Sequence, residues 1–120
     1  MKKLYIIIGV AVAASLFSAC SQQSEAESIV KEFIEQNAIA PEKIEHKEFA
    51  NLDSTKVVRD SLIKVMQNNK HELYKDNIEY LQQNSGRMLY YLRMKYVYEG
   101  DTLSQTFYLD EQLQHVVSFK

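Results

Sequence analysis

The stretch that decides the fold is Met88-Leu89-Tyr90-Tyr91-Leu92-Arg93-Met94-Lys95-Tyr96-Val97-Tyr98. Every second side chain in it is large and apolar, whereas Arg93 and Lys95 occupy the alternate positions. A period of two places these two groups on opposite faces of an extended chain. The pattern therefore predicts a half-buried β-strand over residues 87–98.

Two shorter segments after this strand repeat the alternation. Mainly apolar side chains recur at every second position of residues 103–109 and again of residues 113–119, and the two rows are Leu103, Gln105, Phe107 and Leu109, and Leu113, His115, Val117 and Phe119. Glu99-Gly100-Asp101 and Asp110-Glu111-Gln112 separate the three segments and are typical of turns. The C-terminal third is therefore predicted to be an antiparallel three-stranded meander.

The preceding half of the chain shows helical spacing. Ile29, Val30, Phe33 and Ile34 predict a helix over residues 25–37, with Ser24 and Glu27 as a capping box and with Pro41 beyond its end. Residues 42–52 show no clean alternation, and we interpret them as a weak strand. Residues 54–84 are predicted to form two helices or one bent helix, with Asp53 or Ser54 as the N-cap. Its predicted apolar positions are Val58, Leu62, Val65, Met66, Leu73, Tyr74, Ile78 and Leu81, and Asn84-Ser85-Gly86 is its predicted end.

Amphipathic helices and a sheet with one apolar face must bury these surfaces against each other. We therefore expect an α+β fold, in which N-terminal helices pack on one face of an antiparallel sheet that ends in the C-terminal meander. With 120 residues in total, the chain has room for one domain, which we place at residues 25–120.

The first residues have the composition of a secretory signal peptide. Lys2 and Lys3 precede an apolar stretch from Leu4 to Phe17, and small residues follow it in Phe17-Ser18-Ala19-Cys20. The stretch is shorter than the roughly 20 residues that span a bilayer, and polar residues follow it at once. A signal peptide over residues 1–19, cut between Ala19 and Cys20, is thus favoured over a transmembrane anchor. Residues 20–24 would then form a polar tether.

Phe17-Ser18-Ala19-Cys20 resembles the lipobox of bacterial lipoproteins, in which a leucine usually stands where this chain has Phe17. The resemblance implies cleavage by signal peptidase II, a diacylglycerol thioether on Cys20 and often an acyl chain on its amino group. Cys20 is the only cysteine, so it has no intramolecular disulfide partner. Ser21 after it implies the outer membrane, by a rule known for some Gram-negative families. Whether the domain faces the periplasm or the outside stays open.

The order of helix, weak strand, helices and three strands resembles a reduced NTF2-like or cystatin-like domain. Leu52-Asp53-Ser54-Thr55 and the segment from Gly100 to Glu111 also resemble small lipoproteins of anaerobic Gram-negative bacteria. Neither resemblance implies a particular activity, since unrelated functions share such folds.

The sequence carries no motif that predicts catalysis, a metal site or a cofactor. His71-Glu72 begins like a zinc protease motif, but Lys75 stands where the second histidine is required. His46, His71 and His115 are far apart in sequence, and the single thiol is assigned to lipid. Three glycines form neither a phosphate loop nor a nucleophile elbow.

The net charge and the tyrosines indicate which classes of partner the chain could bind. The chain has 14 Lys and Arg against 16 Asp and Glu, and removing Lys2 and Lys3 with the signal peptide leaves a net charge of −4, which argues against nucleic acid. Tyr91, Arg93 and Lys95 are predicted to form an exposed set that could bind a partner, although tyrosine also fills half-buried sheets without any ligand.

We therefore expect a lipid-anchored envelope protein whose domain is a noncatalytic binding module, held at the membrane by Cys20 and contacting a protein or a glycan. One alternative is a structural or accessory subunit of a membrane complex. A second is a small NTF2-like hydrolase or isomerase, which would need an acid and a base converging in a pocket.

Overall fold

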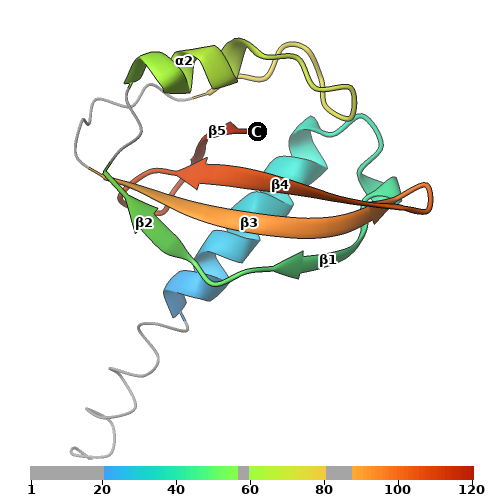
Figure 1. Cartoon of the computed structure of the whole chain (residues 1–120), viewed down its shortest axis with the longest axis horizontal. Helices are drawn as coiled ribbons and strands as arrows, with labels where there is room; N and C mark the ends of the chain where they lie inside the picture. The colour runs from blue at the N-terminus through green and yellow to red at the C-terminus, as the bar shows by residue number, and fades with distance from the viewer. Residues whose placement is uncertain (1–20, 57–59, 81–87) are drawn as a thin grey trace, which may run out of the picture.

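The computed structural model describes residues 21–56, 60–80 and 88–120, and strand β3 (Leu89–Tyr98) is the centre of its sheet. Strand β4 (Asp101–Leu109) runs antiparallel to β3 along its whole length, and β5 (Val116–Phe119) follows at the far side of β4. Strands β1 (Glu45–Phe49) and β2 (Asp53–Thr55) both pair with the other edge of β3 (Figure 1). The predicted C-terminal meander is confirmed.

The alternation predicted for β3 is present in the structure. Leu92, Met94 and Tyr96 are at most 1% exposed, whereas Arg93 and Lys95 are exposed. The connection to β4 has only two residues, Glu99 and Gly100, with φ of 49° and 85°. Positive φ at both central positions matches the twist of antiparallel strands in a two-residue hairpin, and glycine adopts it without steric cost.

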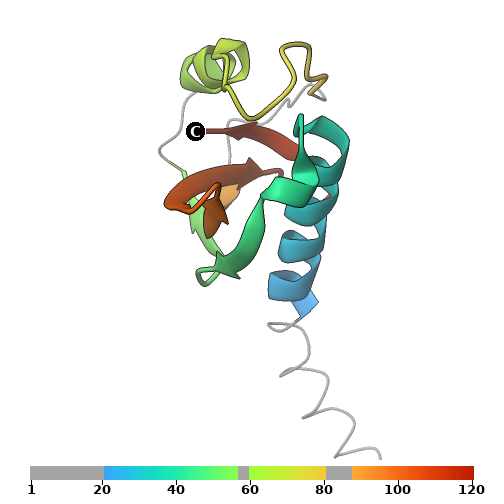
Figure 2. The same ribbon diagram turned by 90° about the vertical axis from the view of Figure 1, so that its right-hand side faces the viewer.

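Helix α1 covers residues 21–37 of the described chain and packs along one face of the sheet (Figure 2). Its buried positions are Ala26, Val30, Phe33 and Ile34, a spacing that keeps them on one side of a 3.6-residue helix. They contact the inward row of β3 and β4 in a single cluster with Leu92, Met94, Tyr96, Phe107, Leu109, Val116 and Phe119. This contact between α1 and the sheet, here called the seam, forms the larger of the two cores in the described part of the chain.

Phe33 lies at the centre of the seam. Its ring centroid is 5.6 Å from Phe119, 6.0 Å from Phe107 and 6.1 Å from both Tyr74 and Tyr80. Aromatic pairs in this distance range add attraction beyond the area that they bury. One α1 side chain therefore links two strands to the segment of residues 69–80.

Helix α2 (Asp60–Asn68) packs on the alternate row of sheet side chains. Ile63 and Met66 form a second cluster with Leu89, Tyr108 and Val117, and Tyr91 packs against it. Gln67 Nε2 also donates a hydrogen bond of 2.7 Å to the Val117 carbonyl of the edge strand β5. The α+β class with two helices packed on an antiparallel sheet is confirmed, and the helices take opposite faces of the strands where the sequence suggested one shared face.

Three finer expectations were wrong or incomplete. Helix α1 already includes residues 21–24, which were assigned to a tether, so Ser24 lies inside the helix and is not its cap. The weak strand expected at residues 42–52 is confirmed over β1 alone, and the 3-10 turn Pro41–Lys43 precedes it. The expected N-cap residues Asp53 and Ser54 belong to β2 instead, and Asp53 accepts a hydrogen bond from Tyr91 Oη at 3.1 Å.

The predicted helical region of residues 54–84 contains α2 alone among its described residues. Residues 69–80 form turns, and Tyr74 makes an antiparallel bridge to Ala38. The tertiary contacts of Leu73 and Tyr74, both buried in the larger core, outweigh their helical spacing. Val58, Leu81 and Asn84-Ser85-Gly86 lie outside the described residues, as do residues 1–19 and Cys20.

The apolar face of α2 also differs from the prediction. Ile63 and Met66 are buried, whereas Leu62 and Val65 are 49% and 56% exposed. We therefore expect Ile63→Ala to destabilise the domain by about 2–5 kcal/mol, the usual cost of truncating a buried isoleucine. The adjacent change Leu62→Ala should cost under about 1 kcal/mol. Urea unfolding gives the free energy of unfolding of the two variants. Equal losses would contradict the assignment of Ile63 to the buried face of α2.

Candidate functional site

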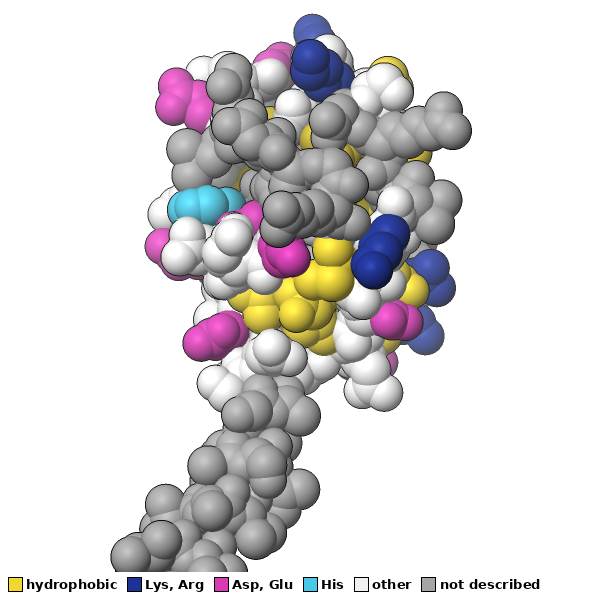
Figure 3. Space-filling model, turned by 90° about the vertical axis from the view of Figure 1, so that its left-hand side faces the viewer, with side chains coloured by type: hydrophobic (Ala, Val, Ile, Leu, Met, Phe, Trp, Pro, Cys, Tyr) yellow, Lys and Arg dark blue, Asp and Glu magenta, His cyan; other side chains and the backbone are white. Residues whose placement is uncertain are grey.

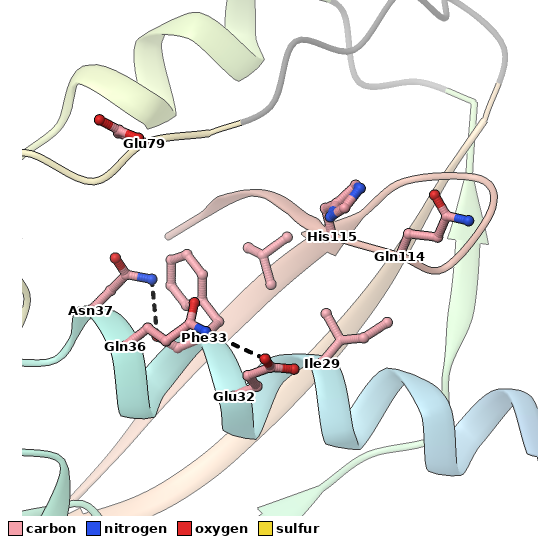
Figure 4. Close-up of a pocket in the computed structure, with 9 residues that line it drawn as sticks. Ile29, Glu32, Phe33, Gln36, Asn37, Glu79, Gln114 and His115 are labelled. Carbon is pink, nitrogen blue, oxygen red and sulfur yellow. Dashed lines mark hydrogen bonds between the residues drawn. The ribbon is translucent and has the colours of Figure 1, made fainter.

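A groove between α1 and the start of β5 is the first candidate site (Figure 4). Its volume is about 250 Å³. The side chains of α1 form one wall, Gln114 and His115 form the opposite wall, and Glu79 comes from the turns of residues 69–80. Apolar Ile29, Phe33 and Val116 lie between the polar groups. The groove thus offers an apolar floor with hydrogen-bonding side chains around it.

The polar groups of the groove are mostly exposed. Gln36 Nε2 donates to Glu32 Oε1 at 3.3 Å, and Asn37 Nδ2 donates to the Phe33 carbonyl at 3.0 Å. Both amides retain a carbonyl oxygen for another donor, and the two carboxylates Glu32 and Glu79 are acceptors. The arrangement suits a small polar ligand that carries hydroxyl or ammonium groups.

Asp110 holds the opposite wall of the groove in place. This residue is 5% exposed, and its Oδ1 accepts hydrogen bonds from the backbone N–H groups of Gln114 at 2.7 Å and His115 at 2.8 Å. Its own backbone N–H donates to the His115 carbonyl at 3.2 Å. Hydrogen bonds to a carboxylate are shorter and stronger than those between neutral groups. The side chain thus fixes the β4–β5 turn and with it two groove residues.

A second hollow lies beside the start of α1. Its volume is about 560 Å³, and its lining combines Gln22, Gln23, Ser24, Glu27, Asn51, Leu52 and Tyr90. Gln23 joins the helix to the connection between β1 and β2: its Oε1 accepts from Leu52 N at 2.6 Å, and its Nε2 donates to the Ala50 carbonyl at 3.0 Å. Figure 3 shows hydrophobic side chains exposed among acidic and basic ones near the point where the described chain begins.

The sequence-predicted set of Tyr91, Arg93 and Lys95 lies on one row of β3, opposite the row that contacts α1. Arg93 and Lys95 are exposed, but Tyr91 is half-buried against the α2 cluster, and its ring centroid is 6.4 Å from that of Tyr108. The hydrogen bond from Tyr91 Oη to Asp53, together with the negative charge of Asp53, raises the pKa of the phenol. Two of the three side chains are thus available for a partner, while Tyr91 also has packing and hydrogen-bonding contacts within the domain.

The three histidines do not meet. His46 lies on β1 and His115 lines the groove, whereas His71 belongs to a polar network between the segment of residues 69–80 and β4. Among the described residues, no three His, Cys, Asp or Glu side chains lie close enough together to hold a metal ion. No helix in the described part of the chain is long and apolar enough to cross a membrane.

His71 accepts a hydrogen bond at one ring nitrogen and lies beside Gln105 of β4 with the other. Its Nδ1 accepts from the Leu73 backbone N–H at 3.2 Å, and its Nε2 lies 3.0 Å from the side-chain nitrogen of Gln105. Tyr74 Oη donates to Gln105 Oε1 at 2.8 Å and completes the network. Partial burial lowers the pKa of His71 from 6.5, with an opposing effect of Glu72. A protonated ring could accept a hydrogen bond at neither nitrogen.

The chain matches none of the protein families, curated proteins or solved structures with which it was compared. The groove and the hollow were not predicted from the sequence, because each combines residues that are far apart along the chain. In the groove the only sequence signal was the polar face of the first helix, which any solvated helix also has.

We predict that Asp110→Ala destabilises the domain by about 1–3 kcal/mol, because two backbone N–H groups lose their acceptor. Asp110→Asn keeps a side-chain oxygen and should lose less. Urea unfolding compares the free energies of the two variants with that of the parent. Equal losses for both variants would show that the acceptor oxygen is not what matters.

The depressed pKa of His71 predicts a pH-dependent stability. The unfolded chain binds the proton near pH 6.5, above the pKa of the folded state. Stability is then full above about pH 7.5 and falls as the pH decreases toward the lower folded pKa. Urea unfolding between about pH 7.5 and 5.5 should show this fall in the parent and a weaker one in His71→Gln. His115→Gln, a change at an exposed histidine, is the control, and an unchanged slope in His71→Gln would contradict the assignment.

Proposed function

We propose that the protein is a lipid-anchored component of a bacterial cell envelope, attached to the membrane through Cys20, with a noncatalytic binding domain. The observation that carries the proposal is the sequence order of charged residues, apolar stretch and Phe17-Ser18-Ala19-Cys20, directly followed by a packed helix. This cysteine has no disulfide partner within the chain, and lipid attachment would account for its presence there. By its position, Ser21 favours the outer membrane.

The groove supports binding as the role of the domain. An apolar floor ringed by amides, carboxylates and a histidine can contact the hydroxyl groups and the apolar face of a sugar ring, or a short polar peptide segment. Its volume of about 250 Å³ is below the usual range for drug-sized ligands, so one ring or side chain would fill it. A protein or a glycan of the envelope is therefore the proposed ligand.

A structural subunit of a membrane complex is the second candidate function. The exposed row of Arg93 and Lys95 on the sheet favours it, because a flat polar strand surface suits another protein better than a small molecule. Both candidates use the same anchor. Extraction together with a second protein in a fixed ratio would favour the structural subunit over the binding module.

The anchor is tested by metabolic labelling with radioactive palmitate in a Gram-negative bacterium that expresses the full chain. We expect label and membrane association in the parent and in Ser21→Ala, the control for a change beside the cleavage site. Cys20→Ser should lose the label completely and leave a larger, unprocessed precursor. Label on Cys20→Ser, or an unlabelled parent, would refute the lipid anchor.

A further inference from the structure

The start of α1 is hydrogen-bonded to the connection between β1 and β2. Gln23 bonds to backbone groups of Ala50 and Leu52 on the β1–β2 connection, and its Nε2 also lies 3.0 Å from Glu27 Oε2. Residue 21 is already helical. In the sequence, Cys20 is the residue directly before this helix. A lipid on Cys20 would be joined directly to the packed domain, without a long tether.

The surface beside this attachment point has a composition suited to the lipid headgroup region. The hollow of about 560 Å³ is lined by the uncharged polar side chains Gln22, Gln23, Ser24 and Asn51, together with Leu52 and Tyr90. Tyrosine is enriched at membrane interfaces, since its ring is apolar and its hydroxyl is polar. Amides and hydroxyls can bond to ester and phosphate oxygens. Among the described residues of the lining, Glu27 is the one charged side chain.

We infer that this end of the domain, comprising residues 21–24, the β1–β2 connection at residues 50–52 and Tyr90, lies against the membrane, with the hollow open to lipid headgroups. The inference rests on the proposed lipid attachment and adds the orientation of the domain. The acidic Glu25 and Glu27 give no electrostatic attraction to anionic lipid. The covalent anchor therefore determines the contact, which should be insensitive to salt.

The orientation leaves the candidate binding groove accessible. Its α1 residues run from Ile29 to Asn37, which places them about 12–24 Å along the helix from residue 21 at 1.5 Å per residue. Helix α2 lies at the end of the domain away from the start of α1 in both ribbon views (Figures 1 and 2). The groove and α2 would then face the aqueous space.

The test uses the lipidated protein in phosphatidylcholine vesicles with one fluorescent label. Cys20 is the only native cysteine and its sulfur carries the lipid, so Asn51→Cys and Lys64→Cys each add a single free thiol at an exposed position. Asn51 borders the hollow and Lys64 lies on α2. Ser24→Cys is a second reporter at the hollow. Quenching is measured with lipids that carry a nitroxide near the headgroup.

We expect quenching at positions 51 and 24 to be severalfold stronger than at position 64, at both low and high salt. Equal quenching at all three positions, or stronger quenching at position 64, would overturn the orientation. The intact mass of each labelled protein is measured first. A mass without lipid would refute the proposed anchor, whereas a lipidated protein with equal quenching would refute only the orientation.

Discussion

The contact between α1 and the inward row of β3–β5 is the constraint on which the rest of the structure depends. Phe33 contacts rings from two strands and from residues 69–80, and Ala26, Val30 and Ile34 extend the seam along the helix. A domain of this size buries a modest fraction of its surface, so few other contacts could replace this one. Both the groove and the hollow beside the start of α1 are built on the same helix.

The seam also explains how a short chain stabilises residues that lack regular structure. Residues 69–80 are turns, but Tyr74 bridges to Ala38 next to α1, bonds to Gln105 on β4 and packs 4.6 Å from Phe119. Burial raises the pKa of the Tyr74 phenol, with smaller effects of Tyr96 and Tyr80, so its hydroxyl remains a donor. The buried hydrogen bond satisfies a polar group that would otherwise be costly inside the core.

The elements that could be predicted from the sequence are those in which the spacing of apolar residues matches the face that the element buries. Strand β3 alternates because one row meets α1, whereas the other row has Arg93 and Lys95 in solvent between residues that are buried or half-buried, and α1 has one buried stripe. Prediction failed where tertiary contacts override local pattern. Leu73 and Tyr74 follow helical spacing, but they lie outside any helix and are buried in the core. Leu62 and Val65 are apolar, but their side chains are exposed on α2. The groove joins residues 29 and 116, which no local pattern could bring together.

We propose that one helix connects a lipid on Cys20 to the core of a binding domain. Native mass spectrometry of the full-length protein, extracted in mild detergent from bacterial membranes, measures both the lipid and any bound partner. We expect the mass of residues 20–120 plus lipid, with a glycan or a protein partner retained. The mass of all 120 residues without lipid, or of a chain cut elsewhere, would contradict it.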